Sequence, residues 1–203
     1  IFMSLGPKFN WIKDNLKKIN YSNILLLLIF MVISFFLIKK TSSEILFISI
    51  LIGAALNLMF VTIKDFFKKK NNISQTISHF GFSLFILSIL FNGLFSSEFS
   101  ANMKVGNELI YKKEKIKFIE IQTLKKKNYK SIIANFEIID EKNNSILLEP
   151  EIRIYNQPNI LTSEADIIST IFFDKFIVVN LLKGEEIFNV RYQKKQFMIW
   201  IWL

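Results

Sequence analysis

Cysteine is absent from the 203 residues, and the chain holds one histidine and six glycines. Without cysteine there is no disulfide framework, no thiolate metal site and no cysteine nucleophile, while an oxidising compartment remains permitted. So few glycines leave no phosphate-cradling loop. The single histidine lies in an apolar run, which argues against Ser-His-Asp or Cys-His chemistry elsewhere in this sequence.

Apolar and basic residues are abundant in the sequence. The chain is 51% hydrophobic with 22 phenylalanines, yet it carries 26 Lys plus Arg and a formal charge of +9. This mixture is typical of a membrane protein with a soluble part. The lysines stand largely beside apolar runs, so anionic membrane lipid is a nearer partner than nucleic acid, and no nucleic-acid partner is expected.

Three apolar runs in the membrane region 1–95 predict transmembrane spans, at about 19–38, 45–63 and 77–95. The second contains Gly53, Ala54, Ala55 and Asn57, a cluster that suits a closely packed helix and one hydrogen bond across the contact. Lysines precede the first span and separate the second from the third. The positive-inside rule therefore places those segments in the cytoplasm and everything after Phe95 outside.

Residues 96–196 predict one small extracytoplasmic domain. Short alternating segments of strand length indicate an antiparallel β structure: "KIKFIEIQ", "IIANFEIID", "ILLEPEIRIY" and "FIVVNLL". "DEKNNSI" predicts a hairpin turn with Asn143 or Asn144 at positive φ. Residues 197–203 predict the start of a final transmembrane helix, which suggests a piece of a larger protein. The expected fold class is thus an α-helical membrane protein, with three transmembrane helices plus the start of a fourth, carrying a small antiparallel β domain.

His79 opens the third apolar run. Two interpretations remain open from the residues alone. It is either a polar residue at the membrane interface or an axial ligand of haem iron, for which a neutral imidazole is a common choice. Ser83, one helical turn away, is small enough to leave room for a flat macrocycle. Glu151 beside Arg153 is more simply a structural ion pair than a catalytic group.

Six short motifs follow one another in an order that is similar to the C-terminal portion of the CcmF/CycK/NrfE family of haem lyase subunits. They are "GPKFNWIKD", "SHFGFSL", Asn128-Tyr129, "PEIRIY", "TSEADI" and "VRYQKKQFMIWIWL". Gln196 stands where the family pattern has Pro, and Ser78 where it has Ala. Neither departure removes a ligand.

The resemblance implies a subunit of the cytochrome c haem lyase of system I maturation, in a bacterial inner membrane with the 96–196 domain in the periplasm. It implies that His79 is an axial ligand of a transmembrane b-type haem, whose second ligand lies elsewhere in the protein. The implied partners are the haem chaperone CcmE, CcmH/CcmI-type subunits and apocytochrome c.

The haem-attachment segment of the family is missing from these residues, so this segment alone is not expected to be an enzyme. The alternative is a membrane-anchored periplasmic interaction module without bound haem. In that case His79 is merely interfacial.

Overall fold

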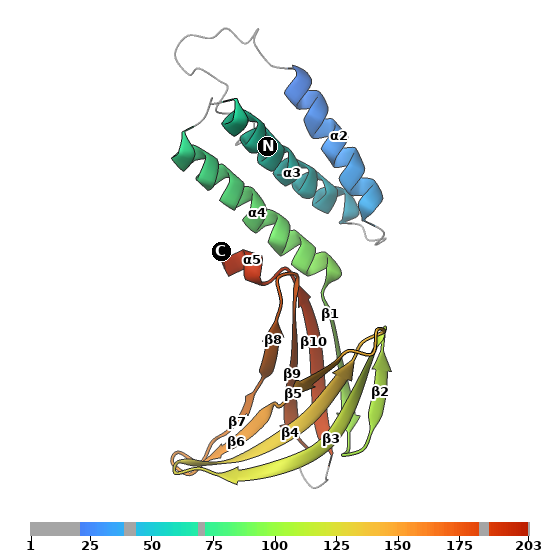
Figure 1. Ribbon diagram of the computed structural model, residues 1–203, viewed down its shortest axis with the longest axis vertical. Coiled ribbons are helices and arrows are strands. Elements are labelled where there is room, and N and C mark those ends of the chain that lie inside the picture. The colour runs from blue at the N-terminus through green and yellow to red at the C-terminus, as the bar shows by residue number, and fades with distance from the viewer. Residues whose placement is uncertain (1–20, 39–43, 69–71, 183–186, 203) are drawn as a thin grey trace. The chain divides into compact units, whose positions relative to one another are not determined.

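The computed structural model describes residues 21–38, 44–68, 72–182 and 187–202 (Figure 1). The motif at Gly6–Asp14, the lysines Lys39 and Lys40 and the last residue, Leu203, lie outside these ranges. The chain divides into two compact units: one is Ile1–Leu94 with Phe197–Leu203, and the other is Phe95–Gln196.

The first unit is helical, with described helices α2 (Tyr21–Leu37), α3 (Ile45–Phe67), α4 (Ile73–Phe95) and α5 (Ile199–Trp202). Two of these, α3 and α4, are long and apolar enough to cross a membrane. The expectation of three spans and the start of a fourth is not confirmed, because α2 has 17 residues and α5 has four. Helix α3 also runs past the apolar stretch that predicted it, because Lys64 and Asp65 are compatible with helix although they are charged.

Helices α2 and α3 pack closely at Gly53. A Cβ atom at this position would lie 2.7 Å from the Cα atom of Met31, so only glycine fits without moving the backbone. The Ser34 hydroxyl of α2 donates a hydrogen bond to the Ser49 carbonyl of α3, at 3.0 Å. The small-residue cluster therefore marks a close helix contact, as its composition predicts.

The hydrogen bond across this contact does not come from Asn57, the residue that the sequence suggested. Asn57 is fully buried, and neither atom of its amide has a hydrogen-bond partner among the residues that the structure describes. Ser34 provides the bond because its short side chain reaches a backbone carbonyl of the facing helix. Spacing along α3 alone could not reveal that contact.

The second unit is a β-sandwich of two antiparallel sheets, which confirms the predicted antiparallel β architecture. One sheet has the order β1-β10-β9-β8, with bounds Ser97–Met103, Phe188–Gln196, Phe173–Leu181 and Asp166–Ser169. The other has the order β2-β3-β4-β6-β7, with bounds Glu108–Tyr111, Glu114–Lys125, Tyr129–Ile139, Glu151–Tyr155 and Leu161–Glu164. Strand β5 (Ser145–Leu148) also pairs with β4.

Alternate side chains of the central strands fill the space between the sheets. Phe118 of β3 stacks on Phe136 of β4 with ring centroids 4.4 Å apart, and meets Phe188 of β10 edge-on at 5.6 Å. Each such ring contributes about 1.5–3 kcal/mol by leaving water. The buried core comprises Met103, Ile116, Phe118, Ala134, Phe136, Ile138, Leu148, Ile152, Ile177, Val179, Phe188, Val190 and Tyr192.

The segment "ILLEPEIRIY" is two strands rather than one, which corrects the prediction. Strand β5 ends before Glu149 and Pro150, and β6 begins after them. Proline has no N–H to donate to a ladder, so the strand is interrupted there. The Pro150 carbonyl still accepts a hydrogen bond from the Ala134 amide at 3.0 Å, and this bond keeps the chain beside β4.

The hairpin turn between β4 and β5 forms as predicted. Asn143 has φ +59°, the positive value that asparagine tolerates. The Asp140 carboxylate accepts bonds from the Asn144 amide N–H at 2.9 Å and from its side chain at 3.0 Å. These bonds, first the one from the Asn144 side chain, hold the pKa of Asp140 below its ordinary value.

Candidate functional site

His79 lies in the second turn of α4, about 9 Å of helical rise from the first residue, Ile73. Its imidazole is half-buried. In the part of the chain that the structure describes, no group of three or more His, Asp or Glu side chains is placed to hold a metal ion. Among the described residues, His79 is therefore a single imidazole donor that is not part of such a group.

The helix face around His79 is partly occupied. Ser83, one turn on, is fully buried and its hydroxyl donates to the Phe80 carbonyl at 2.8 Å. Further along, Ile86 and Leu90 pack against the buried cluster that includes Ile52 of α3. The open room expected over Ser83 is thus absent in this structure, although the small side chain itself is where the sequence predicts it.

Two apolar crevices border α4, of about 380 and 520 Å³. The larger is lined by Phe80, Gly81 and Phe85 of α4 and by Trp200 of α5, among others. The smaller lies near Ile45 and Gly93. His79 lines neither crevice. Only 17% of the apolar window of α4 is buried within this segment, against 50% for α3, so most of the surface of α4 faces surroundings beyond these residues.

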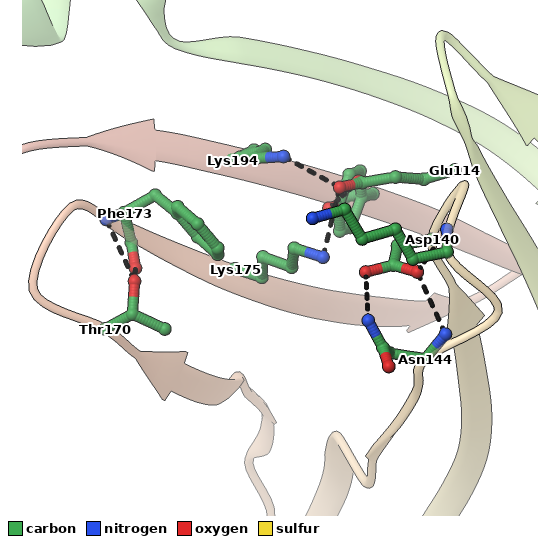
Figure 2. A network of polar contacts seen from close by, with 9 residues as sticks. Glu114, Asp140, Asn144, Thr170, Phe173, Lys175 and Lys194 are labelled. Carbon is green, nitrogen blue, oxygen red and sulfur yellow. Dashed lines mark hydrogen bonds and ion pairs between the residues drawn. The ribbon is translucent and has the colours of Figure 1, made fainter.

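The sandwich contains a second polar site that sequence reasoning missed, a cluster around Glu114 at the start of β3 (Figure 2). Figure 2 shows Lys175 of β9 and Lys194 of β10 pointing at the Glu114 carboxylate, with ion-pair distances of 3.0 and 2.7 Å. Tyr192 of β10 donates its phenol hydrogen to the same carboxylate. The Lys194 ammonium also lies 4.8 Å from the centre of the Phe173 ring.

The charge state of this cluster follows from its contacts. Burial alone raises the pKa of Glu114, but hydrogen bonds from Lys194, Tyr192 and Lys175 together outweigh burial, so the pKa lies below its ordinary value. Burial, and then the bond to Glu114, raises the pKa of Tyr192. The carboxylate is therefore ionised and the phenol neutral at neutral pH. The site links the two sheets.

No sequence signal marked Glu114, because it stands in the lysine-rich string "YKKEKIK". Its role depends on partners about 60 and 80 residues away, which only the pairing of the sheets brings together. Glu151 and Arg153 do form the expected structural ion pair, at 3.0 Å. The Arg153 bond is the main reason why the pKa of Glu151 lies below its ordinary value.

Asn128-Tyr129, "PEIRIY" and the first half of "TSEADI" meet on one sheet, while the second half of "TSEADI" continues into β8 of the other sheet. Tyr129 pairs in register with Tyr155, and Glu151 pairs with Glu164. The Tyr129 and Tyr155 rings lie 5.2 Å apart, and the Arg153 guanidinium lies 5.3 Å from the Tyr129 ring centre. These motifs, which are separate in the sequence, thus lie side by side on β4, β6 and β7.

Comparison with known proteins gives one family and two similar proteins. Residues 94–196 match the family described as the CcmF C-terminal beta-sandwich. The whole chain aligns with the cytochrome c-type biogenesis protein CcmF of Escherichia coli (strain K12), at 23% identity over 215 residues, and covers 33% of that protein.

Among solved structures, the cytochrome c haem lyase CcmF has a similar fold. The TM-score is 0.74 with 15% sequence identity, and the match covers 98% of this chain and 35% of that one. The chain thus spans about a third of the length of the relatives it matches.

Proposed function

Because the chain belongs to the CcmF C-terminal β-sandwich family, we propose that it is the C-terminal portion of a haem lyase subunit that acts in cytochrome c maturation. The family match over the sandwich carries this proposal. The similarity of the whole chain to CcmF, helices included, supports it. The catalytic activity belongs to the larger protein, since the segment that attaches haem lies outside these residues.

His79 is the residue that we assign to cofactor binding, as an axial ligand of a b-type haem. Its imidazole lies on an apolar helix and is half-buried, so the ring can be held in one orientation without being sealed off. The family resemblance implies a second histidine ligand, which would come from another part of the protein because this chain has a single histidine. When bound, the haem would supply a one-electron carrier. His79 would set its position and contribute to its potential.

The membrane arrangement belongs to the same proposal. Helices α2, α3 and α4 cross the bacterial inner membrane, α5 begins a further span, and the sandwich lies in the periplasm. The 17 residues of α2 rise about 26 Å, slightly less than a hydrocarbon core of about 30 Å. Two apolar neighbours of its ends, Ile19 and Ile38, extend the sequence to a full span.

The partners in this proposal are the haem chaperone CcmE, CcmH/CcmI-type subunits and apocytochrome c. The absorbance spectrum of the purified full-length protein tests the cofactor assignment. A six-coordinate b-type haem gives sharp α and β bands on reduction. A full-length protein without haem, isolated from haem-replete cells, would instead favour a membrane-anchored interaction module with His79 at the interface.

A further inference from the structure

The hairpin between β3 and β4 carries an unusual concentration of positive charge. The sixteen residues from Ile121 to Phe136 include four lysines and no aspartate or glutamate. The lysines are Lys125, Lys126, Lys127 and Lys130, and all four are exposed. A run of lysines is usually just a solvated surface. Whether this run has a further role therefore depends on its position, its ion pairs and its apolar neighbours.

This hairpin extends beyond the sandwich core. The first half of β3 alternates between buried and half-buried residues, but from Ile119 to Lys125 every residue is exposed. Figure 1 shows the β3–β4 hairpin curving outward beside the β6–β7 connection. The two turns are tied together, because the Asn156 amide donates to the Asn128 carbonyl at 3.1 Å.

The projecting end is ordered by its own contacts. The Lys126 amide donates to the Tyr129 carbonyl at 2.9 Å, and the Tyr155 amide donates to the Ile160 carbonyl at 2.8 Å. The Tyr129 and Tyr155 rings pack against each other, with centroids 5.2 Å apart. A rigid surface of this kind binds a partner with little loss of its own conformational entropy.

Three lysines elsewhere on the same sheet have countercharges that the lysines at this end lack, although Lys112 and Lys142, in turns at the opposite end, form no ion pair either among the described residues. Lys113 pairs with Glu141 at 3.0 Å, and Lys115 pairs with Glu108. By contrast, none of the four hairpin lysines forms an ion pair with any residue that the structure describes. Glu151 is attracted to Lys126, but its carboxylate already accepts hydrogen bonds from Arg153 and Ser131.

Apolar side chains accompany the charge. Leu124, Ile160 and Leu161 are 43%, 49% and 52% exposed. We call these three residues and the four lysines the basic tip. Apolar contacts beside unneutralised lysines suit a partner that offers both carboxylates and apolar side chains.

We propose that the basic tip is a docking surface for an acidic polypeptide segment of a partner protein. Two features favour a polypeptide over lipid: the exposed apolar side chains beside the lysines, and a place at the end of the sandwich away from its two chain connections. The chain enters and leaves the sandwich at one end, where Ser97 pairs with Lys194 and where β3 begins near Lys194. The tip lies at the other end of the 12-residue strand β3, about 40 Å away.

Both connections to the helical unit therefore leave from the end of the sandwich opposite the tip, a strand's length away along β3. The proposal goes beyond the proposed function and does not depend on haem binding by His79. Either one can fail while the other holds.

The test uses the full-length protein in nanodiscs of neutral phosphatidylcholine. The probe is a fluorescein-labelled synthetic peptide of alternating glutamate and leucine, with a glutamine–leucine peptide of equal length as its control. Binding is followed by fluorescence anisotropy at low and high NaCl. We expect the glutamate peptide alone to bind, and its affinity to fall as salt rises.

Two double variants with the same charge change locate the binding site. Lys126→Gln with Lys127→Gln should weaken binding about tenfold, whereas Lys112→Gln with Lys142→Gln, at the opposite end, should change it less than about twofold. Lys126→Arg with Lys127→Arg should keep the affinity. Hydrogen exchange of the β4 amides verifies that each variant is folded.

Equal losses in the two glutamine variants would overturn the proposal, because the peptide would then sense only net charge. So would failure of the glutamate peptide to bind at low salt. Vesicles of phosphatidylglycerol provide the lipid comparison. If they compete with the peptide for Lys126 and Lys127 and bind more tightly, the surface belongs to a membrane instead.

Discussion

The Tyr192 phenol on β10 donates a hydrogen bond to the Glu114 carboxylate on β3, and so connects the two sheets of the sandwich through a buried polar contact. The same carboxylate neutralises Lys175, whose side chain is only 4% exposed. Removing either partner from such a group leaves the other buried without compensation, which costs far more than the pair contributes. The stability of the sandwich thus depends on a group that hydrophobic patterning does not reveal.

Replacing Glu114 with glutamine keeps the shape but removes the charge that faces Lys175 and Lys194. We expect the sandwich to lose about 3–5 kcal/mol of stability. Hydrogen exchange of the β9 and β10 amides measures this loss. The matched variant Glu141→Gln removes an exposed ion pair with Lys113 and should cost about 1 kcal/mol or less. Equal costs for the two variants would contradict a special role for Glu114.

The same cluster predicts two pH limits. The pKa of Glu114 is lowered in the folded state, so its contribution is present above its unfolded pKa of about 4.3 and is lost as pH falls through the folded value. The pKa of Tyr192 is raised, so its contribution is complete below its unfolded pKa of about 10 and declines as pH rises. Unfolding of the sandwich measured from acid to alkaline pH should show both losses. In Tyr192→Phe the alkaline loss should diminish.

The sequence predicted the elements with strong patterns and missed those whose partners are distant. Regular alternation located β3, β4, β6 and β9, and Asn143 located the turn after β4. Strands β1, β7 and β8 are polar or only four residues long, so their pairing with neighbours defines them more than their composition does.

The candidate site was predictable to a different extent. His79 stood out because it is the only histidine and lies in an apolar run. The sequence could not show that the Ser83 side chain is buried, because its burial depends on how other segments of the same chain pack around it. Nor could it show that Asn128-Tyr129 and "PEIRIY" would share one sheet, since register is set by pairing across the hairpin.

Helix packing gives a test with an internal control. Gly53→Ala places a methyl group against the Met31 backbone at 2.7 Å, so α2 and α3 must separate. Gly93→Ala, in α4, meets no atom within 4 Å, so the new methyl group causes no clash there. Both substitutions raise helix propensity by about 1 kcal/mol, and only the clash differs. We expect Gly53→Ala to raise hydrogen exchange in α2 while Gly93→Ala does not.

The proposed orientation places the turn between β4 and β5 in the periplasm. A reporter inserted at the exposed residue Asn143 should show alkaline phosphatase activity, and a cytoplasmic reporter there should be silent. A second insertion at Lys69, in the basic loop between the second and third spans, should give the opposite pattern. Cytoplasmic signals at Asn143 would reverse the orientation and contradict the periplasmic assignment.

His79→Ala in the full-length protein tests the cofactor assignment most directly. Loss of one of two axial ligands leaves a five-coordinate iron, so the sharp b-type bands should disappear or weaken severely and haem content should fall. Alanine favours helix, and no ion pair involving His79 exists among the described residues, so insertion and the sandwich should be preserved.

The matched control is Ser78→Ala, which changes the neighbouring, exposed residue to alanine and should keep the spectrum. Together the two variants separate loss of a ligand from disturbance of the start of α4, because both lie in the same helical turn. The expected His79→Ala protein inserts, keeps the hydrogen-exchange protection of its sandwich, and fails to mature cytochrome c. A His79→Ala protein with wild-type haem content and bands would rule out the ligand role, and the imidazole would then be an interfacial group at the start of an apolar helix.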